Sequence, residues 1–194
     1  MISDRLPLAL DAVTLPSDGL IAVLHPGEGV DLSALPKDRV VVVSPMATVC
    51  AGFAARGYEV SPEMPADVRF AASIVCLTRA RAEAQALVAA AMARTDGVVI
   101  VDGQKTDGAD SMLKAMRARG VVSTPISKAH GKIYWADGGA DFSDWAKGPE
   151  LHPGGFWTAP GVFSADGVAP ASELLVQALP EVMVGTGADL GAGW

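Results

Sequence analysis

The sequence has little that would anchor it in a membrane or direct it out of the cell. Its longest apolar run, near residues 84–93, is alanine-rich and contains Gln85, so it falls short of the roughly 20 apolar residues that span a bilayer. The N-terminal stretch lacks the basic start and long apolar core of a secretory signal, because Asp4, Pro7 and Asp11 interrupt it. We therefore expect a cytoplasmic protein with no membrane partner.

Cysteine is also scarce, with two residues in 194, and neither has a neighbour at the spacing of a metal site. Cys50 and Cys76 both lie in apolar surroundings, which favours buried, reduced thiols over a disulfide in a reducing compartment. His25 and His152 have no cysteine, histidine or acid at ligand spacing, so we expect no metal there. The G-x-S-x-G motif of serine hydrolases does not occur either.

Charged residues make up only 19% of the chain, and the net charge is -7. Half of the residues are hydrophobic, which is enough to bury the core of one ordinary domain with a short extension. The negative net charge argues against nucleic-acid binding by the surface as a whole.

Short apolar runs alternate with helix-type segments through most of the chain. Residues 39–44 (RVVVVS) form an uninterrupted β-branched run, typical of a strand that is buried on both faces. Further strands are expected at 20–24, 58–61, 73–78, 97–102, 121–127 and 132–136, the last two as a candidate antiparallel pair, with helices at 48–56, 79–94 and 109–119. This alternation is typical of an α/β, Rossmann-like sheet with mostly parallel strands.

The composition changes after about residue 140. We expect the α/β domain at 1–140, a Gly/Pro/Trp-rich linker at 141–160 and the start of a second domain at 161–194. The linker carries Trp145 and Trp157, which we expect to pack against a domain. In the second domain, a helix is predicted at 169–179 and a strand from about Thr186.

The last six residues, Asp189-Leu190-Gly191-Ala192-Gly193-Trp194, place an acid and two glycines after an apolar approach. Glycines at the end of a strand allow a tight turn and let backbone N–H groups come close to a ligand. A simple surface turn would have the same pattern. A ligand loop would continue beyond Trp194, so we expect the chain to be truncated.

Three segments together resemble the "methyltransferase small" family, and in particular bacterial 16S ribosomal RNA guanine-N2 methyltransferases with two tandem methyltransferase-like domains. The first is Gly103-Gln104-Lys105-Thr106-Asp107-Gly108, similar to the family's G-x-K-x-x-G segment. The second is Ser127-Lys128-Ala129-His130-Gly131-Lys132, similar to S-K-A-H-G-R. The third is PGVFSADGVAPASELL at 160–175, followed by ADLGAGW.

The resemblance implies that the first domain is a degenerate methyltransferase-like fold without a cofactor site, which helps structure and RNA recruitment. It implies a second domain that binds S-adenosylmethionine and methylates a guanine exocyclic amine. On this view Asp189, Gly191 and Gly193 line the cofactor pocket, and the segment from Phe163 to Ser172 lies over it.

The sequence departs from the family pattern in two places. Ala169 stands where the family often has an acid, and the Asn-Pro-Pro-Phe-type tetrapeptide that holds the target amine is absent. We therefore expect no catalytic residue in the chain as given and no activity of this part alone.

The stretch 104–135 reverses the overall charge, with a net charge of +4 before His130 is counted. Lysine and arginine neutralise phosphates, so this stretch is a candidate contact for ribosomal RNA or the small ribosomal subunit. A solvated helix face explains Lys114, Arg117 and Arg119 equally well, and Tyr134 and Trp135 could stack on bases or lie in the core. The candidate RNA-binding residues are Lys105, Lys128, His130 and Lys132.

Two alternatives to the methyltransferase remain open at this point. The first is a non-catalytic RNA-binding or structural module with a Rossmann-like fold. The second is a nicotinamide-dependent oxidoreductase, which the sequence disfavours because no complete G-x-G-x-x-G occurs and RVVVVSPMA has no glycine after its strand.

Overall fold

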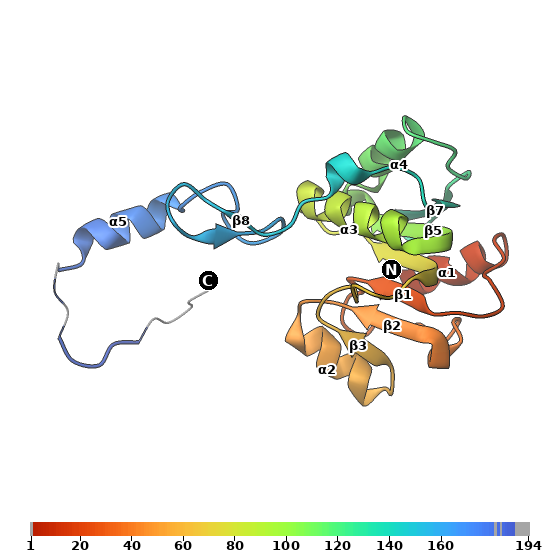
Figure 1. Ribbon diagram of the computed structural model, residues 1–194, viewed down its shortest axis with the longest axis horizontal. Coiled ribbons are helices and arrows are strands. Elements are labelled where there is room, and N and C mark those ends of the chain that lie inside the picture. Colours follow the sequence, from red (N-terminus) through yellow and green to blue (C-terminus); the bar gives the residue numbers. More distant parts are fainter. Residues whose placement is uncertain (1, 181, 183, 189–194) are drawn as a thin grey trace. The chain divides into compact units, whose positions relative to one another are not determined.

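The computed structural model describes residues 2–180, 182 and 184–188. Its internal contacts divide the chain into two units, Met1–Lys147 (unit 1) and Gly148–Trp194 (unit 2). Figure 1 shows the elements of both. No helix in the described part of the chain is long and apolar enough to cross a membrane.

Unit 1 is built on a seven-stranded sheet with the order β3-β2-β1-β4-β5-β7-β6. The first five strands in this order are parallel, and β7 and β6 run antiparallel to their neighbours. The strands are β1 (Ile21–Leu24), β2 (Val40–Val43), β3 (Glu59–Ser61), β4 (Phe70–Cys76), β5 (Thr95–Gln104), β6 (Ile126–Lys128) and β7 (Gly131–Asp137). The α/β, mostly parallel sheet predicted from the sequence is thus confirmed.

Helices cover both faces of this sheet, so most strands are buried on two sides. In β2, Val40 and Val42 face one core and Val41 and Val43 face the other, which explains why the run is apolar without alternation. The first core contains side chains of α1 (Ile2–Leu10) and α2 (Ala47–Ala55), and the second those of α3 (Arg81–Arg94) and α4 (Ala109–Arg117). Short 3-10 helices lie at Lys37–Arg39, Lys105–Asp107 and Ser143–Trp145.

The helix α1 is not predicted from the sequence, because Pro7 lies inside it and proline normally interrupts a helix. Its buried residues Ile2, Arg5, Leu6 and Ala9 recur at helical spacing and pack on the sheet. The apolar contacts of this face therefore override the local preference of proline.

The strand predicted at 121–127 is shorter than expected, because β6 begins only at Ile126. Val121 is almost fully exposed, and Pro125 has no N–H to give to a ladder. Ser123 instead pairs with Trp135, as its N–H donates to the carbonyl of Trp135 (2.9 Å) and its hydroxyl accepts from the Trp135 N–H (3.0 Å).

Unit 1 extends past residue 140 because two aromatic side chains are buried there. Phe142 and Trp145 pack edge to face with ring centroids 4.8 Å apart, and both belong to the core that contains α3 and α4. The expected packing of Trp145 is therefore confirmed. Trp157 is 65% exposed, so the same expectation is wrong for that residue.

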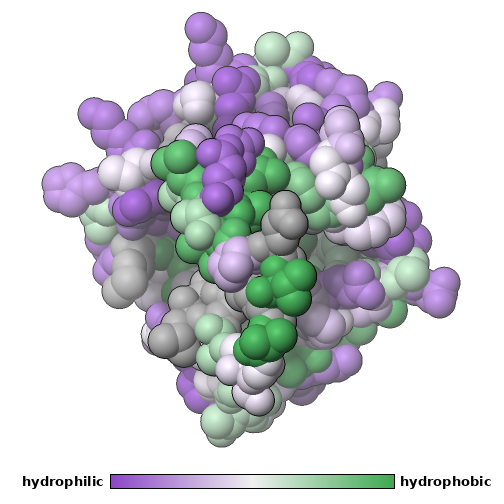
Figure 2. All heavy atoms as spheres, turned by 90° about the vertical axis from the view of Figure 1, so that its left-hand side faces the viewer, coloured by the Kyte–Doolittle hydropathy of each residue, from purple (hydrophilic) through white to green (hydrophobic). Residues whose placement is uncertain are grey.

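Unit 2 contains a two-stranded antiparallel sheet of β8 (Glu150–Leu151) and β9 (Trp157–Thr158), and the helix α5 (Pro170–Ala178). α5 begins on a proline, whose missing N–H has no partner in a first turn in any case. Apolar side chains reach the surface on the face drawn in Figure 2. The large apolar side chains of α5 that are exposed are Leu174, Leu175 and Val176.

Candidate nucleic-acid interface

Two segments of unit 1, residues 103–108 and 127–132, carry the predicted RNA-binding residues and are called the two basic motifs below. They are far apart in sequence but lie side by side in the structure. β5 and β7 are antiparallel neighbours, and their register places Gln104 opposite Gly131. The segment that follows β5 therefore meets the turn between β6 and β7. The N–H of Lys105 donates to the carbonyl of His130 over 3.0 Å and links the two.

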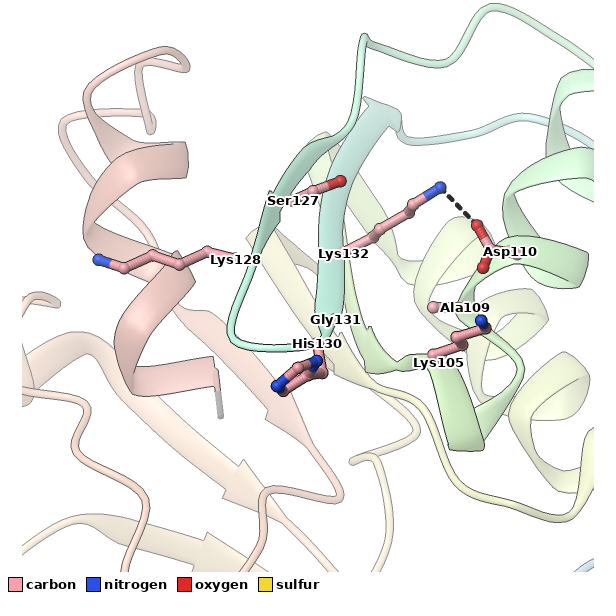
Figure 3. Close-up of a pocket in the computed structure, with 8 residues that line it drawn as sticks. All are labelled: Lys105, Ala109, Asp110, Ser127, Lys128, His130, Gly131 and Lys132. Atoms are coloured by element: carbon pink, nitrogen blue, oxygen red, sulfur yellow. Dashed lines mark hydrogen bonds and ion pairs between the residues drawn. The ribbon is translucent and has the colours of Figure 1, made fainter.

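A pocket of about 370 Å³ lies where these motifs meet (Figure 3). All four residues predicted to bind RNA line it, although the lysine after β5 is more than twenty positions from the other three. The lining residues are Lys105, Ala109, Asp110, Ser127, Lys128, His130, Gly131 and Lys132.

The basic side chains of this pocket do not all point the same way. Lys132 reaches across to α4 and forms an ion pair with Asp110, while Lys105 lies beside the start of α4 (Figure 3). Lys128 extends from the opposite side of the β6–β7 hairpin, toward α1, and His130 lies at the tip of the turn. The pocket thus holds Lys105 and Lys132 together, and Lys128 presents its charge on a second side.

Asp110 is the acid among the residues that line this pocket, and it offsets the charge of Lys132 alone. The hydrogen bond and charge of Lys132 hold the pKa of Asp110 below its usual value, so this carboxylate stays ionised and paired. Lys105 and His130 remain as further basic groups, and phosphate oxygens are suited to both.

The two glycines of the G-x-K-x-x-G segment, Gly103 and Gly108, are each required by the local structure for a different reason. A Cβ at Gly103 would lie 2.8 Å from a methyl carbon of Leu77, so only glycine fits under that side chain. Gly108 has a φ of +79° at the start of α4, where glycine is favoured. Between them, the Gln104 N–H donates to the Asp107 carboxylate at 3.1 Å and closes a capping box that fixes Lys105.

The turn that carries His130 has an uncommon backbone. Ala129 and His130, neither of them glycine, both adopt the left-handed conformation, with φ of 49° and 58°. They are the two loop residues of the β6–β7 hairpin, and the tightest hairpin turns take a positive φ at both of these positions.

Arg5 of α1 lies behind this turn and was missed by the sequence analysis. Its guanidinium forms a bidentate ion pair with Asp102 of β5, with Nε–Oδ1 2.6 Å and Nη2–Oδ2 2.8 Å. Burial raises the pKa of Asp102, and the contacts with Arg5 oppose that shift. No sequence signal pairs residues 97 positions apart, although an acid at the end of an apolar strand is itself conspicuous.

The aromatic residues near the pocket belong mainly to the core. Tyr134 is fully buried, its hydroxyl donates to the Ala109 carbonyl at 3.4 Å, and burial raises its pKa. Stacking of Tyr134 on a base, one of the two possibilities left open by the sequence, is therefore wrong. Trp135 is half-buried and packs against the core that contains α1.

The basic residues at the end of α4 have partners of their own. Arg119 binds both carboxylate oxygens of Asp144 at 2.6 Å and lies 4.6 Å from the ring centre of Trp145. Arg117 donates to the Ser123 carbonyl over 3.3 Å. These contacts support the interpretation that the basic residues of α4 belong to a solvated helix face. Arg117 and Arg119 there bind other parts of unit 1.

The residues predicted to lie near the cofactor all belong to unit 2. Phe163 is 79% exposed, and Ser172 lies exposed in the first turn of α5, where its N–H donates to the Ala169 carbonyl (2.9 Å). Asp189, Gly191 and Gly193, as well as most of the strand expected from Thr186, lie outside the described residues.

The carboxyl end of β1 in unit 1 carries a histidine where ligand loops of such sheets usually begin. His25 has a φ of +51°, and its Nδ1 lies 3.7 Å from a carboxylate oxygen of Glu83 at the start of α3. Burial lowers the pKa of His25, and Glu83 opposes this only in part. Within the described residues, no group of three histidines, cysteines or acids could hold a metal ion.

Comparison with known proteins links this architecture to methyltransferases. Residues 154–194 match the family described as the methyltransferase small domain. None of the curated proteins compared with the chain matches it.

Solved structures of methyltransferases share the fold. One is the T. thermophilus 16S rRNA N2 G1207 methyltransferase (RsmC) in complex with AdoMet and guanosine, with 23% identity, a TM-score of 0.68 and coverage of 91% of this chain and 51% of that one. Another is magnesium protoporphyrin IX methyltransferase (ChlM) from Synechocystis PCC 6803 with bound SAM, with 12% identity, a TM-score of 0.52 and coverage of 70% and 77%. A third is an rRNA methylase from Escherichia coli, with 12% identity, a TM-score of 0.50 and coverage of 70% and 64%.

The chain spans about half the length of the T. thermophilus protein. At these identities, the similarity concerns the fold, which is the Rossmann-like fold of methyltransferases. The resemblance to the methyltransferase small family that the sequence motifs indicate is confirmed by the match of residues 154–194.

Proposed function

We propose that this chain is the N-terminal part of an S-adenosylmethionine-dependent ribosomal RNA guanine-N2 methyltransferase. The match of residues 154–194 to the methyltransferase small domain carries this proposal. The similarity of 91% of the chain to half of an rRNA methyltransferase supports it, since the other half of that protein would correspond to a catalytic part that follows.

The cofactor in this proposal is S-adenosylmethionine, which supplies the methyl group when bound. Asp189, Gly191 and Gly193 would contact it, and Phe163 and Ser172 would lie over it. The exposure of Phe163 and Ser172 fits this role, because an apolar ring and a hydroxyl are both free to meet a ligand that has apolar and polar parts. In this proposal a C-terminal catalytic domain completes the site, so we expect this chain alone to be inactive.

The RNA contact in this proposal lies at the pocket between the two basic motifs of unit 1. Lys105 and Lys132 would neutralise phosphates at the pocket, where His130 would donate a hydrogen bond, and Lys128 would neutralise them on the other side of the hairpin. Such contacts would hold ribosomal RNA or the small ribosomal subunit, while the catalytic domain positions the guanine amine.

A binding experiment tests the RNA part of the proposal. Anisotropy of a labelled 16S rRNA hairpin should report binding that weakens as salt increases, and Lys105→Ala/Lys132→Ala should weaken it about tenfold. The control, Lys37→Ala/Lys147→Ala, removes the same charge at two exposed lysines that do not line the pocket. Equal losses in both variants would refute a specific RNA contact at the pocket.

Calorimetry tests the cofactor part. The parent protein with its catalytic domain should bind S-adenosylmethionine, and Gly191→Val should abolish binding, because a branched side chain blocks the backbone approach to the ligand. No heat of binding in the full-length parent would refute the methyltransferase.

The second candidate function is a non-catalytic RNA-binding or structural module. The observation that favours it is that all four predicted RNA-binding residues gather at one pocket inside unit 1, which needs no other domain to form it. Salt-sensitive RNA binding by a parent protein that binds no cofactor would support this function over the enzyme.

A further inference from the structure

Arg5 stands out because it is a charged side chain that is completely buried. It has 0% exposure, and among the described residues with fully buried side chains it is the largest by volume. Transfer of a guanidinium from water is unfavourable unless its donors are all used. The partners of its guanidinium donors therefore show which parts of unit 1 Arg5 holds in place.

The guanidinium of Arg5 has two different partners. Nε and Nη2 bind the two carboxylate oxygens of Asp102, which already neutralises its charge. The remaining nitrogen, Nη1, donates to the carbonyl of Lys128 at 2.9 Å and lies 3.5 Å from that of Ala129. The ion pair with β5 thus leaves one donor aimed at the turn between β6 and β7.

The carbonyl groups of this turn are all held from within unit 1. Arg5 binds that of Lys128, and the N–H of Lys105 binds that of His130. The Gln104 amide, oriented with its nitrogen toward the turn, donates at 3.0 Å to the carbonyls of Ala129 and His130. With its carbonyls directed inward, the turn directs the side chains of Lys128 and His130 outward.

Gly131, the first residue after this turn, packs directly against the Arg5 guanidinium. A Cβ at this position would overlap the Arg5 guanidinium and the carbonyl oxygen of Gly103. Arg5 therefore fills the space behind the two-residue hairpin turn, whose central residues Ala129 and His130 both have a positive φ.

We propose that Arg5 is the positioning residue of the RNA contact: by holding the Lys128 carbonyl, it fixes the turn that presents Lys128 and His130 to the phosphodiester backbone. This inference rests on the proposed function for the RNA, and on the contacts above for the geometry. On this inference α1 supports the RNA contact, although the side chain of Arg5 does not reach the surface.

The variant Arg5→Lys separates the two roles of the guanidinium. A single ammonium keeps the charge opposite Asp102 but cannot also reproduce the planar contact with the Lys128 carbonyl. The matched control is Arg39→Lys. Arg39 also holds a set of loop carbonyls, those of Pro16, Ser17, Asp18 and Gly19, but it does not line the pocket.

Two measurements follow on each variant. Amide hydrogen exchange of residues 128–131, without RNA, should become at least tenfold faster in Arg5→Lys and stay unchanged in Arg39→Lys. The affinity for the 16S rRNA hairpin should fall about tenfold, and the slope of log Kd against log salt should decrease by about 0.7, for the one lost contact of Lys128 with an unpaired stretch of the hairpin. A loss of stability alone would not change that slope.

The outcomes are distinguishable. Unchanged exchange at the turn in Arg5→Lys would overturn the inference whatever happens to RNA. Faster exchange with unchanged affinity and slope would also overturn it, provided that Lys105→Ala/Lys132→Ala weakens binding. Failure of the unmodified protein to bind RNA would refute the proposed RNA contact and, with it, the positioning role.

A second variant covers the case in which Arg5→Lys does not fold. Arg5→Met/Asp102→Leu replaces the buried ion pair by apolar side chains of similar size, a change that proteins often tolerate. It removes the donor to the Lys128 carbonyl without leaving a buried charge. Faster exchange at 128–131 with the same change of salt slope is expected, and wild-type exchange or slope would overturn the proposal.

Discussion

Removal of the Arg5 guanidinium should destabilise unit 1 far more than removal of an equally well paired arginine at the surface. The change is Arg5→Met, which keeps much of the apolar volume and deletes the charge. It leaves the carboxylate of Asp102, which is 4% exposed, without its bidentate partner and frees the carbonyl of Lys128. The matched control is Arg69→Met, since Arg69 binds Asp96 at 2.6 Å with both side chains more than half exposed.

The magnitudes follow from burial. Breaking a buried pair by removing one partner costs about 3–5 kcal/mol, because the remaining charge is unpaired in a medium of low polarity. An exposed pair contributes about 0–1 kcal/mol. For a unit of this size, about 4 kcal/mol corresponds to a fall of roughly 8–16 °C in Tm. It is also a large part of a typical total stability of about 5–15 kcal/mol.

Urea unfolding followed by far-ultraviolet circular dichroism measures both variants. We expect a clear decrease of the midpoint for Arg5→Met and a shift within error for Arg69→Met. The further change Asp102→Leu in the Arg5→Met background should restore at least half of the loss, because it removes the unpaired carboxylate.

The loss should also depend on pH. Burial raises the pKa of Asp102, and Arg5 supplies the largest opposing contribution, so without it the carboxyl takes up a proton more readily in the folded variant. A raised folded pKa stabilises the fold at low pH and loses that effect as pH rises. The deficit of Arg5→Met should therefore be smaller near about pH 5 than near about pH 8. Equal losses for Arg5→Met and Arg69→Met at neutral pH would refute this account of the pair.

Burial lowers the pKa of His25, so stability should fall as pH decreases below about 6.5, and His25→Asn, which tolerates a positive φ, should flatten this dependence in urea titrations between about pH 5 and 7. Gly97→Ala should cost about 2–3 kcal/mol in the same assay, since its Cβ would overlap the backbone carbonyl of Ala71. Burial raises the pKa of Cys76, whereas Cys50 is only partly covered, so a thiol reagent should label Cys50 in the native protein and Cys76 only after unfolding; rapid native labelling of both would contradict this.

The order of strands and helices was accessible from the sequence because local patterns encode it. The run Val40–Val43 has an apolar residue at every position, which indicates a strand with a core on each face, and α4 carries Met112, Leu113 and Met116 at helical spacing. The family resemblance came from the sequence for a similar reason. PGVFS and the segment after it are short motifs, each contained within a few consecutive residues.

The prediction of four basic RNA-binding residues rested on composition and resemblance, and it named the residues without their arrangement. Only the antiparallel pairing of β5 with β7 places Lys105 beside His130, and only the hairpin turns Lys128 to the other side. Contacts between strands depend on the whole sheet, so no local pattern contains them. The same holds for Tyr134, whose place in the core follows from which face of β7 meets α4.

The sequence by itself therefore determined the α/β class, most of its elements and the link to methyltransferases, because periodicity and motifs are local properties. The tertiary structure alone decided that α1 forms despite Pro7, since the apolar face it buries outweighs a local interruption. It also decided that Arg5 meets Asp102 across 97 positions and holds the turn of the basic pocket. This contact forms only in the folded chain, where both residues are buried and each charge would be costly without its partner.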